Sequence, residues 1–474
     1  MHQNRKDLSR QVRQQAADID ASRPPIRHAH NNEEYSYRDT ADAKTPPTLI
    51  AMYTKGLPHD PETGLALNPV DYKLFVAGIQ SGNPVDFRLT PLGPAKTPAN
   101  DQQPSQEQIT PDSTAKQRQG VWQSDAAKNH PIDDGTAKGA FVRAWESASA
   151  GNVFDLEGPD AQSVTMPPAP TLCSDELLAE MVEVYAMALL RDANFRSFPL
   201  PKSCGQNVRR RTDRSRKPAR LGRARDFDYA TDLMVDLPWF AWSTADLQLT
   251  SEAERRRRTL ADDGSNLFRG STSGEQVGPY LSQFLLLGNN ALGHSNNAPG
   301  RLPTDGYALY GSLGIDLRVR IATEARDYLT TWAPFVDVQN GADLRGAETY
   351  VDPNPDAGKD PSRGHRFITT PRDLATYVHY DALYEAYLNA CVFLLSAGAP
   401  FDRGLPFMNA DAFDKQQGFA HFGGPHILTL VCEVATRALK AVRYQKFNVH
   451  RRLRPEALGG LIDRYLNDPA LATG

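Results

Sequence analysis

The segment Lys446-Phe-Asn-Val-His-Arg-Arg-Leu-Arg-Pro455 decides how this chain folds, because it gathers cations at the end of a long apolar stretch. Four basic positions follow the spacing i, i+3, i+7 and i+11 and are predicted to share one face of a continuous helix: Arg443, Lys446, His450 and Arg454. Like charges on one helical face repel each other, so this stripe predicts an anion bound against it. A basic face that is only solvated is the alternative interpretation.

The residues before the stripe support the anion interpretation. Residues 425–442 are rich in apolar side chains and predict a mostly buried helix, with Pro425 suited to its first turn. We therefore expect the stripe to continue a core helix, where an unpaired charge is costly. Arg454 can hold an oxoanion through two parallel N–H groups, and Lys446 acts as a compact point charge. Turnover would also need a nucleophile or ligand, usually histidine, and an acid/base group.

Composition argues against several classes of protein. The net charge of -4 over 474 residues argues against a general nucleic-acid binder. The four cysteines have no CxxC spacing, so neither a disulfide framework nor a zinc site is predicted. The N-terminus has no apolar stretch, and no run of about 18 apolar residues occurs. We therefore expect no signal peptide, no membrane span and, by default, a cytoplasmic location.

Composition also divides the chain into three regions. Residues 1–47 are polar and predict a disordered arm, and residues 48–170 predict a loop-rich region. Residues 171–474 lack long strand alternation and predict a mainly α body of helical bundles. Within this body, residues 201–225 carry ten Lys or Arg against one Asp and predict a solvated, disordered insertion. A nucleic-acid or phosphate patch is the alternative for this insertion.

Local signals predict where the helices of the body begin and end. Ser174 is an expected N-cap, and Thr370-Pro-Arg-Asp373 resembles a capping box with proline at the first helical position. Gly398 is the expected residue just past the end of the helix that this box starts. The predicted helices cover residues 175–192, 228–242, 278–287, 315–331 and 371–398.

A short polar loop between two helices offers oxygen ligands for a cation. Its hard oxygen donors are Asn409, Asp411, Asp414 and Gln416. Such donors suit Ca²⁺, although their spacing is not that of an EF-hand. An exposed polar turn without a metal is the alternative.

Lys446 and the pair Arg454-Pro455, separated by seven residues, resemble the first part of the anion-site signature of vanadium-dependent haloperoxidases. These enzymes share a helical fold with the type 2 phosphatidic-acid phosphatases. The resemblance covers residues 48–474 except 201–225 and points to the bacterial, cyanobacterial and red-algal bromoperoxidase branch. The other motifs that carry it are Val277-Gly-Pro-Tyr-Leu-Ser-Gln-Phe284, Thr370-Pro-Arg-Asp-Leu-Ala-Thr-Tyr-Val378, Ala382-Leu-Tyr-Glu-Ala-Tyr-Leu-Asn-Ala390, Phe422-Gly-Gly-Pro-His-Ile-Leu428, Val442-Arg-Tyr-Gln-Lys-Phe-Asn-Val-His-Arg451 and residues 153–168.

This resemblance implies an enzyme that oxidises bromide with hydrogen peroxide to hypobromous acid, which then halogenates small organic substrates. It implies that Lys446 and Arg454 bind vanadate, whose vanadium acts as a Lewis acid. Arg443 matches the arginine that this branch carries beside the halide site, which favours bromide over chloride. Because such relatives form large oligomers, a homo-oligomer is also implied.

The same resemblance assigns a structural calcium ion to the polar loop. Phe407 and Asn409 would give backbone oxygens, and Asp414 and Gln416 would give side-chain oxygens. A calcium site therefore replaces the metal-free turn as the expectation for this loop.

Other site residues of the family lie further along the chain than Arg-Pro. They are a Ser-Gly-His segment, a third arginine and the histidine that ligates vanadium, and no Ser-Gly-His occurs in the sequence. From the sequence we therefore expect a C-terminally truncated chain without the axial and acid/base histidines, which does not brominate. Two alternatives remain at this point: a phosphatase of the same superfamily, and a non-catalytic helical scaffold or oligomer subunit.

Overall fold

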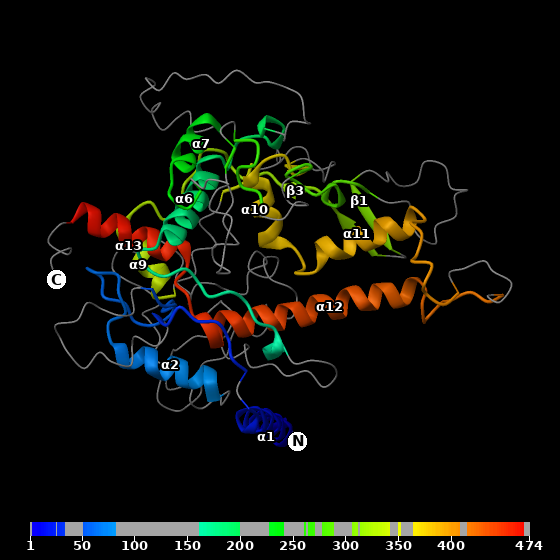
Figure 1. The fold of residues 1–474 in the computed structure, drawn as a ribbon, viewed down its shortest axis with the longest axis horizontal. Helices are drawn as coiled ribbons and strands as arrows, with labels where there is room; N and C mark the ends of the chain where they lie inside the picture. Colours follow the sequence, from blue (N-terminus) through cyan, green and yellow to red (C-terminus); the bar gives the residue numbers. More distant parts are fainter. Residues whose placement is uncertain are drawn as a thin grey trace, which may run out of the picture.

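Helices dominate the part of the chain that the computed structural model describes (Figure 1). The predicted basic insertion at 201–225 lies outside this part, and so do Asn409, Asp411 and Asp414 of the polar loop. The mainly α fold class predicted from the sequence is confirmed. The described residues are 2–24, 26–33, 51–81, 161–199, 227–240, 260–261, 264–270, 277–288, 306–310, 313–341, 349–351, 364–407 and 415–468.

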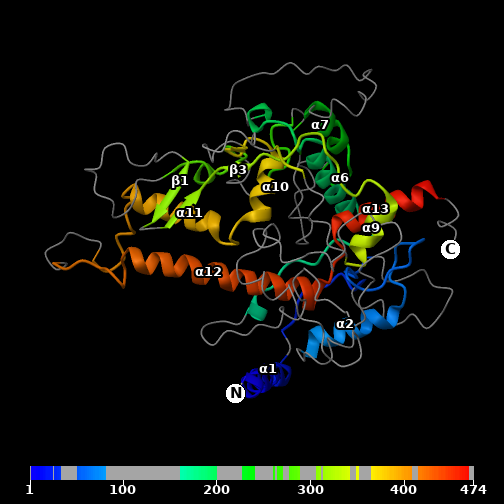
Figure 2. The same ribbon diagram turned by 180° about the vertical axis from the view of Figure 1, so that it is seen from behind.

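One long helix, α12 (Gly424–Tyr444), crosses the molecule in Figures 1 and 2. Helices α1 and α2 lie on one side of it, and α10, α11 and a β-hairpin lie on the other. The other α-helices are α1 (His2–Ser22), α2 (Pro69–Ser81), α6 (Asp175–Leu189), α7 (Phe227–Val235), α9 (Trp332–Gln339), α10 (Pro371–Tyr380), α11 (Glu385–Ser396) and α13 (Pro455–Asn467).

Short elements complete the described structure. Strands β1 (Tyr307–Tyr310) and β2 (Leu313–Asp316) form an antiparallel hairpin, and β3 (Val319–Arg320) pairs antiparallel with β4 (His365–Arg366). A π-helical segment, η12 (Gln445–His450), follows α12 directly. Single 3₁₀ turns occur at η5 (Ala161–Ser163), η6 (Phe195–Ser197) and η9 (Gln283–Leu285).

The helix starts that the sequence predicted from capping residues are confirmed. The Ser174 side chain accepts a hydrogen bond from the amide of Leu177 at 3.1 Å. Thr370 and Asp373 form both halves of a capping box, with Pro371 in the first turn of α10. These signals succeed because the partners that satisfy the first free N–H groups lie within three residues.

Several predicted helices are shorter than expected or wrong. The predicted helix over 371–398 is two helices, because Asp381 leaves the helical conformation (ψ 155°) and α11 begins at Glu385. Gly398 has a φ of +67°, as expected for the residue just past a helix end. The predicted helix over 315–331 is wrong, since β2 and β3 occupy its first residues. β2 pairs with the neighbouring strand β1 and β3 with the distant strand β4, so strand pairing overrides local helical periodicity.

Two further helices and the N-terminal arm also differ from expectation. Only one 3₁₀ turn forms within residues 278–287, and α7 ends at Val235 instead of residue 242. The arm predicted to be disordered begins with α1, a helix rich in Gln, Arg and Ala. These residues lose little side-chain freedom in a helix, so helix propensity accounts for the difference.

Buried ion pairs fasten α10 to its surroundings. The carboxylate of Asp373 is fully buried and accepts hydrogen bonds from the guanidinium of Arg366 and from the amide of Thr370. Arg372 donates two hydrogen bonds to Asp192, just after α6, at 2.5 and 2.9 Å. A buried carboxylate is tolerated when its oxygens are satisfied in this way, so these contacts fix α10 relative to α6 and β4.

Two adjacent glycines let α13 pack closely against its neighbours. A β-carbon on Gly460 would overlap the ring of Phe335 in α9, and one on Gly459 would overlap the hydroxyl of Tyr185 in α6. The close approach of three helices therefore depends on the absence of side chains at both positions. It also fixes the start of α13, which directly follows Arg454.

We predict that Gly460→Ala destabilises the protein although alanine favours helices. Overlap with Phe335 is expected to lower the free energy of unfolding by about 1–3 kcal/mol. The control is Gly424→Ala at the start of α12, where a β-carbon meets nothing within 4 Å. It should change stability by less than about 1 kcal/mol. Urea denaturation of both variants measures the difference, and equal stabilities would contradict this packing.

Candidate anion-binding site

The stripe predicted from the sequence does not lie on one continuous helix. Helix α12 ends at Tyr444, and the following residues form the π-helical η12. Arg451 then adopts a left-handed conformation with φ 44°, and its amide closes the last π-type bond to the carbonyl of Lys446 at 3.0 Å. The helical path therefore stops before Arg454.

Pro455 explains why the helix cannot reach Arg454. Proline disfavours the helical conformation in the residue before it, and Arg454 is extended with φ -72° and ψ 149°. Proline also suits the first turn of a helix, so α13 begins at Pro455. The predicted single face for Lys446 and Arg454 is thus wrong, although both residues reach the same region by another route.

The burial predicted for the stripe is also wrong within the described part of the chain. There, α12 buries only Ala441 fully, and Val434 is 62% exposed. The side chain of Arg454 is 48% exposed, and that of Lys446 is exposed as well. The cations therefore stand at a surface that water and small anions reach.

An extended segment from the N-terminal region, residues 51–53, lies against the end of the stripe. The amide of Tyr53 donates to the carbonyl of Arg451 at 2.7 Å, and the amide of Leu453 donates to the carbonyl of Ala51 at 2.8 Å. Met52 and Arg452 form the antiparallel bridge between these two bonds. Backbone pairing therefore joins two segments that are far apart in sequence.

The ammonium group of Lys446 contacts two aromatic rings where these segments pair. Its ammonium nitrogen lies 4.7 Å from the ring centroid of Phe447 and 5.9 Å from that of Tyr53. The two rings meet edge to face at 5.8 Å within a buried cluster that includes Phe75 of α2. Cation–π attraction therefore contributes to holding the ammonium group at this position.

Two further charged residues, Lys55 and Glu456, lie beside Arg454 and form a charged cluster with it. The Nε of Arg454 donates to Glu456 Oε1 at 2.5 Å, and Lys55 Nζ lies 3.7 Å from the same oxygen. Burial lowers the pKa of Lys55, and the charges of Arg454 and Lys446 lower it further, while Glu456 raises it. Lys446 and Arg454 are therefore both close enough to Lys55 to repel it. Sequence reasoning missed Lys55, because nothing in its own neighbourhood marks it.

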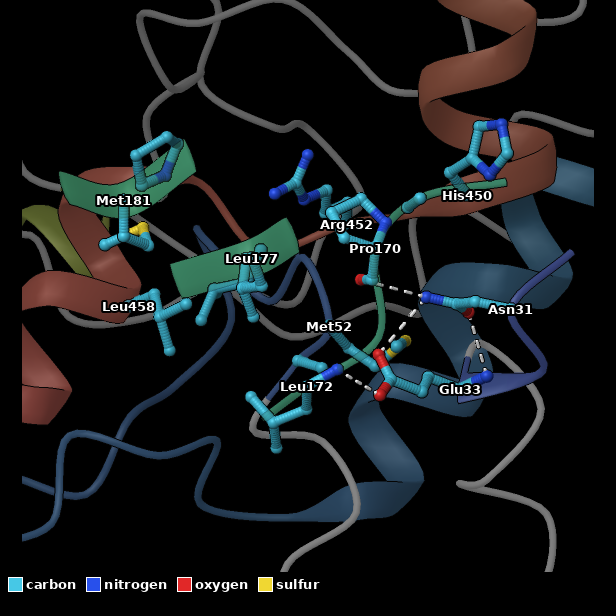
Figure 3. A pocket seen from close by; sticks show the side chains of 14 residues that line it. Asn31, Glu33, Met52, Pro170, Leu172, Leu177, Met181, His450, Arg452 and Leu458 are labelled. Atoms are coloured by element: carbon cyan, nitrogen blue, oxygen red, sulfur yellow. Dashed lines mark hydrogen bonds between the residues drawn. The ribbon is translucent and has the colours of Figure 1, made fainter. Parts of the chain in front are cut away.

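His450 and Arg443, the other members of the stripe, have different surroundings. Arg443 is half-buried in the last turn of α12, one turn before Lys446. His450 lines a small cavity together with Glu33 and Arg452 (Figure 3). The cavity measures about 20 Å³, which is room for one or two water molecules. It is therefore too small for an organic substrate.

Burial and nearby positive charge keep His450 neutral. They lower its pKa to about 4, with His30, His28, Arg452 and Arg451 adding to the effect of burial. A neutral imidazole contributes no positive charge, so His450 does not act as a cation of the stripe near pH 7.

The polar loop predicted to bind calcium is described only at its ends. Phe407 has a left-handed conformation with φ 64°, and its ring contacts Phe422 at 6.3 Å. Gln416 is exposed, while Asn409 and Asp414 lie outside the described residues. Within the described part, no cluster of three or more His, Cys, Asp or Glu side chains could hold a metal ion. No described helix is long and apolar enough to cross a membrane.

Comparison with known proteins identifies the fold and the family. None of the protein-family models compared with the sequence matches it. Among solved structures, the homohexameric second vanadate-dependent bromoperoxidase of Ascophyllum nodosum aligns with a TM-score of 0.57 and 20% identity. That alignment covers 98% of this chain and 57% of the other. At this identity the likeness establishes the fold, which is the helical fold of a haloperoxidase.

Curated relatives carry the identification further. The vanadium-dependent bromoperoxidases of Corallina pilulifera and Corallina officinalis are 44% and 42% identical over 467 residues. The alignments span 97% of this chain and 68% of each relative. The bromoperoxidase of Ascophyllum nodosum is 25% identical over 372 residues, which are 75% of this chain and 53% of that protein. The chain belongs to the vanadium-dependent bromoperoxidases, as its motifs predicted.

A pH-dependent stability follows from two histidines near the site. Burial lowers the pKa of His59 to about 4, as it does for His450. His59 is 6% exposed, and its ring nitrogens contact the carbonyl of Leu57 at 2.7 Å and the hydroxyl of Thr54 at 2.9 Å. Both histidines are therefore expected to stay neutral in the folded protein at pH values where they are protonated in the unfolded chain.

We predict that stability falls as the pH drops from 6.5 to about 4. In this window the two histidines bind protons in the unfolded chain but not in the folded chain, so the free energy of unfolding decreases as the pH falls. The part due to His59 is about 3 kcal/mol. Denaturation curves at several pH values measure the slope, which His59→Gln should make shallower and His59→Gln with His450→Gln shallower still. An unchanged slope in the double variant would contradict this assignment.

Proposed function

We propose that this chain provides the vanadate-binding cations of a vanadium-dependent bromoperoxidase, which oxidises bromide with hydrogen peroxide to hypobromous acid. Hypobromous acid then halogenates small organic substrates. The observation that carries the proposal is that Lys55 lies beside Glu456, the carboxylate to which Arg454 donates, and that the charges of Arg454 and Lys446 both act on Lys55. The relatives at 42–44% identity are named for the same chemistry.

The cluster fits a tetrahedral oxoanion. Repulsion from Arg454 and Lys446 already lowers the pKa of Lys55, and a bound anion would relieve that repulsion. Arg454 can donate parallel N–H bonds to oxoanion oxygens when it exchanges Glu456 for the anion, and Lys446 adds a point charge. When bound, vanadate supplies a Lewis-acid centre that polarises its oxygen ligands. The residues of this chain hold that centre and neutralise its charge.

Arg443 is proposed to face the halide. Arg443 lies one helical turn before Lys446, at the end of α12. A halide bound by Arg443 would therefore lie close to an oxoanion bound by Lys446. In a form of the protein that turns bromide over, Arg443→Trp is expected to shift preference from bromide toward chloride. An unchanged ratio of bromide to chloride turnover would remove Arg443 from the halide site.

A structural calcium ion is proposed for the polar loop. Phe407 and Asn409 would provide backbone oxygens, and Asp414 and Gln416 would provide side-chain oxygens, which are the donors that Ca²⁺ prefers. Chelation with EGTA is expected to lower the melting temperature, and magnesium should not restore it. Identical melting curves with and without calcium would argue against the ion.

Self-association is proposed because the long helices leave apolar side chains uncovered. Tyr387 of α11 and Val434 of α12 are both 62% exposed. Exposed apolar faces of this kind commonly mark protein interfaces, and the solved Ascophyllum nodosum relative is a homohexamer. Analytical ultracentrifugation tests the proposal, and a monomer at micromolar concentration would refute it.

The vanadate-binding roles are tested by direct binding measurements. We predict that Lys446→Ala and Arg454→Ala each weaken vanadate binding about tenfold or more, because each removes a charge-assisted contact. Lys440→Ala is the matched control, since this lysine lies on α12 outside the stripe positions 443, 446, 450 and 454. Vanadium-51 NMR titration or equilibrium dialysis at low ionic strength gives the dissociation constants.

Two outcomes would contradict these roles. Equal affinities for Lys446→Ala and Lys440→Ala would exclude Lys446 from the site. Hydrolysis of a phosphate ester by a protein that binds no vanadate would favour a phosphatase instead.

A further inference from the structure

We propose that Lys55 is a third oxoanion-binding cation of this site, contributed by a segment far in sequence from Lys446 and Arg454. The inference rests on the proposed function, because the ligand is the vanadate that those two residues are proposed to bind. Four observations carry it: a fixed backbone, a shared carboxylate oxygen, limited exposure and repulsion of Lys55 by the charges of Arg454 and Lys446.

The backbone around Lys55 is held in place by a tight turn. The amide of Leu57 donates to the carbonyl of Thr54 at 3.0 Å, which places Lys55 and Gly56 at the turn's centre. Gly56 has a φ of +97°, a conformation that favours glycine at the third position of such a turn. Its amide also donates to the carbonyl of Gln339, at the end of α9, at 2.7 Å. Lys55 therefore projects from a rigid support.

The pairing of residues 51–53 with 451–453 aligns this turn with the start of α13. That pairing brings Lys55 within two residues of Tyr53, whose ring lies under the ammonium group of Lys446. Glu456 lies in the first turn of α13, immediately after Arg454 and Pro455. Lys55 thus lies beside Glu456, two residues past Arg454, and close enough to Lys446 for its charge to act on Lys55.

One oxygen atom marks where an anion would bind. Glu456 Oε1 accepts a hydrogen bond from Arg454 Nε at 2.5 Å and lies 3.7 Å from Lys55 Nζ. A negatively charged oxygen between a guanidinium and an ammonium group has the surroundings that an oxygen of vanadate needs. We therefore infer that Glu456 occupies this position until an oxoanion replaces it.

Burial and repulsion suit Lys55 to this role. Its side chain is only 23% exposed, whereas the Arg454 side chain is 48% exposed. The pKa of Lys55 is lowered first by burial and then by the charges of Arg454 and Lys446. An anion of more than one charge would offset this repulsion better than a single carboxylate does.

A structural role for Lys55 is the competing explanation. Lys55 could act only through Glu456, by fixing the carboxylate that orients Arg454. The two explanations differ in a double-mutant cycle with Glu456→Gln, because an effect transmitted through the carboxylate disappears once its charge is removed. A direct contact between Lys55 and the oxoanion persists in that background.

The experiment measures orthovanadate binding to the full 474-residue chain by vanadium-51 NMR titration. Lys55→Met is expected to weaken binding about tenfold, which corresponds to the loss of one charge-assisted contact. Lys55→Arg retains the charge and should recover most of the affinity. Lys73→Met, an exposed lysine of α2, is the matched control and should bind like the wild type. Thermal melting of each variant verifies that the fold is retained.

The outcomes separate this inference from the proposed function. A tenfold loss for Lys55→Met in both the wild-type and Glu456→Gln backgrounds, with recovery by Lys55→Arg, supports a direct contact. If Lys446→Ala weakens vanadate binding but Lys55→Met does not, this inference is overturned and the proposed function stands. The same holds if Lys55→Met weakens binding in the wild-type background but not in the Glu456→Gln background. A wild-type chain that binds no vanadate overturns both.

Discussion

The backbone pairing of residues 51–53 with 451–453 is the interaction on which the rest of the site depends. Two hydrogen bonds, from Tyr53 to Arg451 and from Leu453 to Ala51, join the N-terminal region to the turn between η12 and α13. Tyr53 and Phe447 pack in one buried cluster with apolar residues of α2, and this burial stabilises the pairing. Without it, Lys55 and the ring beneath Lys446 would have no defined position.

Charge repulsion sets the chemical character of this junction. Lys55 and Arg454 meet at the Glu456 carboxylate, and the charges of Arg454 and Lys446 both lower the pKa of Lys55. Residues elsewhere hold this arrangement: α13 is fixed by its close glycine contacts with α6 and α9, and the turn at Gly56 by its bond to Gln339. A site that concentrates like charges in this way is ready for an oxoanion, and the family assignment supports vanadate as that anion.

Sequence reasoning succeeded where the deciding interactions are local. Ser174 and Thr370 were predicted as helix caps because their partners lie within three residues, and the structure confirms both. It failed where strand pairing outweighs helical periodicity: β2 pairs with the neighbouring β1, and β3 finds its partner at residues 365–366. The course of the stripe helix was also misjudged, although Pro455, which keeps Arg454 out of the helical conformation, was present in the motif itself. The prediction followed the repeated spacing of the basic residues, whereas the structure follows the steric restriction that proline places on the residue before it.

The sequence by itself determined the family and the mainly helical fold class, because these depend on residue identity and short spacing. Only the tertiary structure decided that α12 exposes much of its apolar surface within the described residues, and that Lys55 joins Arg454 at the Glu456 carboxylate. The physical reason is the same in each case. Burial and charge proximity are properties of segments brought together from far along the chain, and no local pattern records which segments will meet.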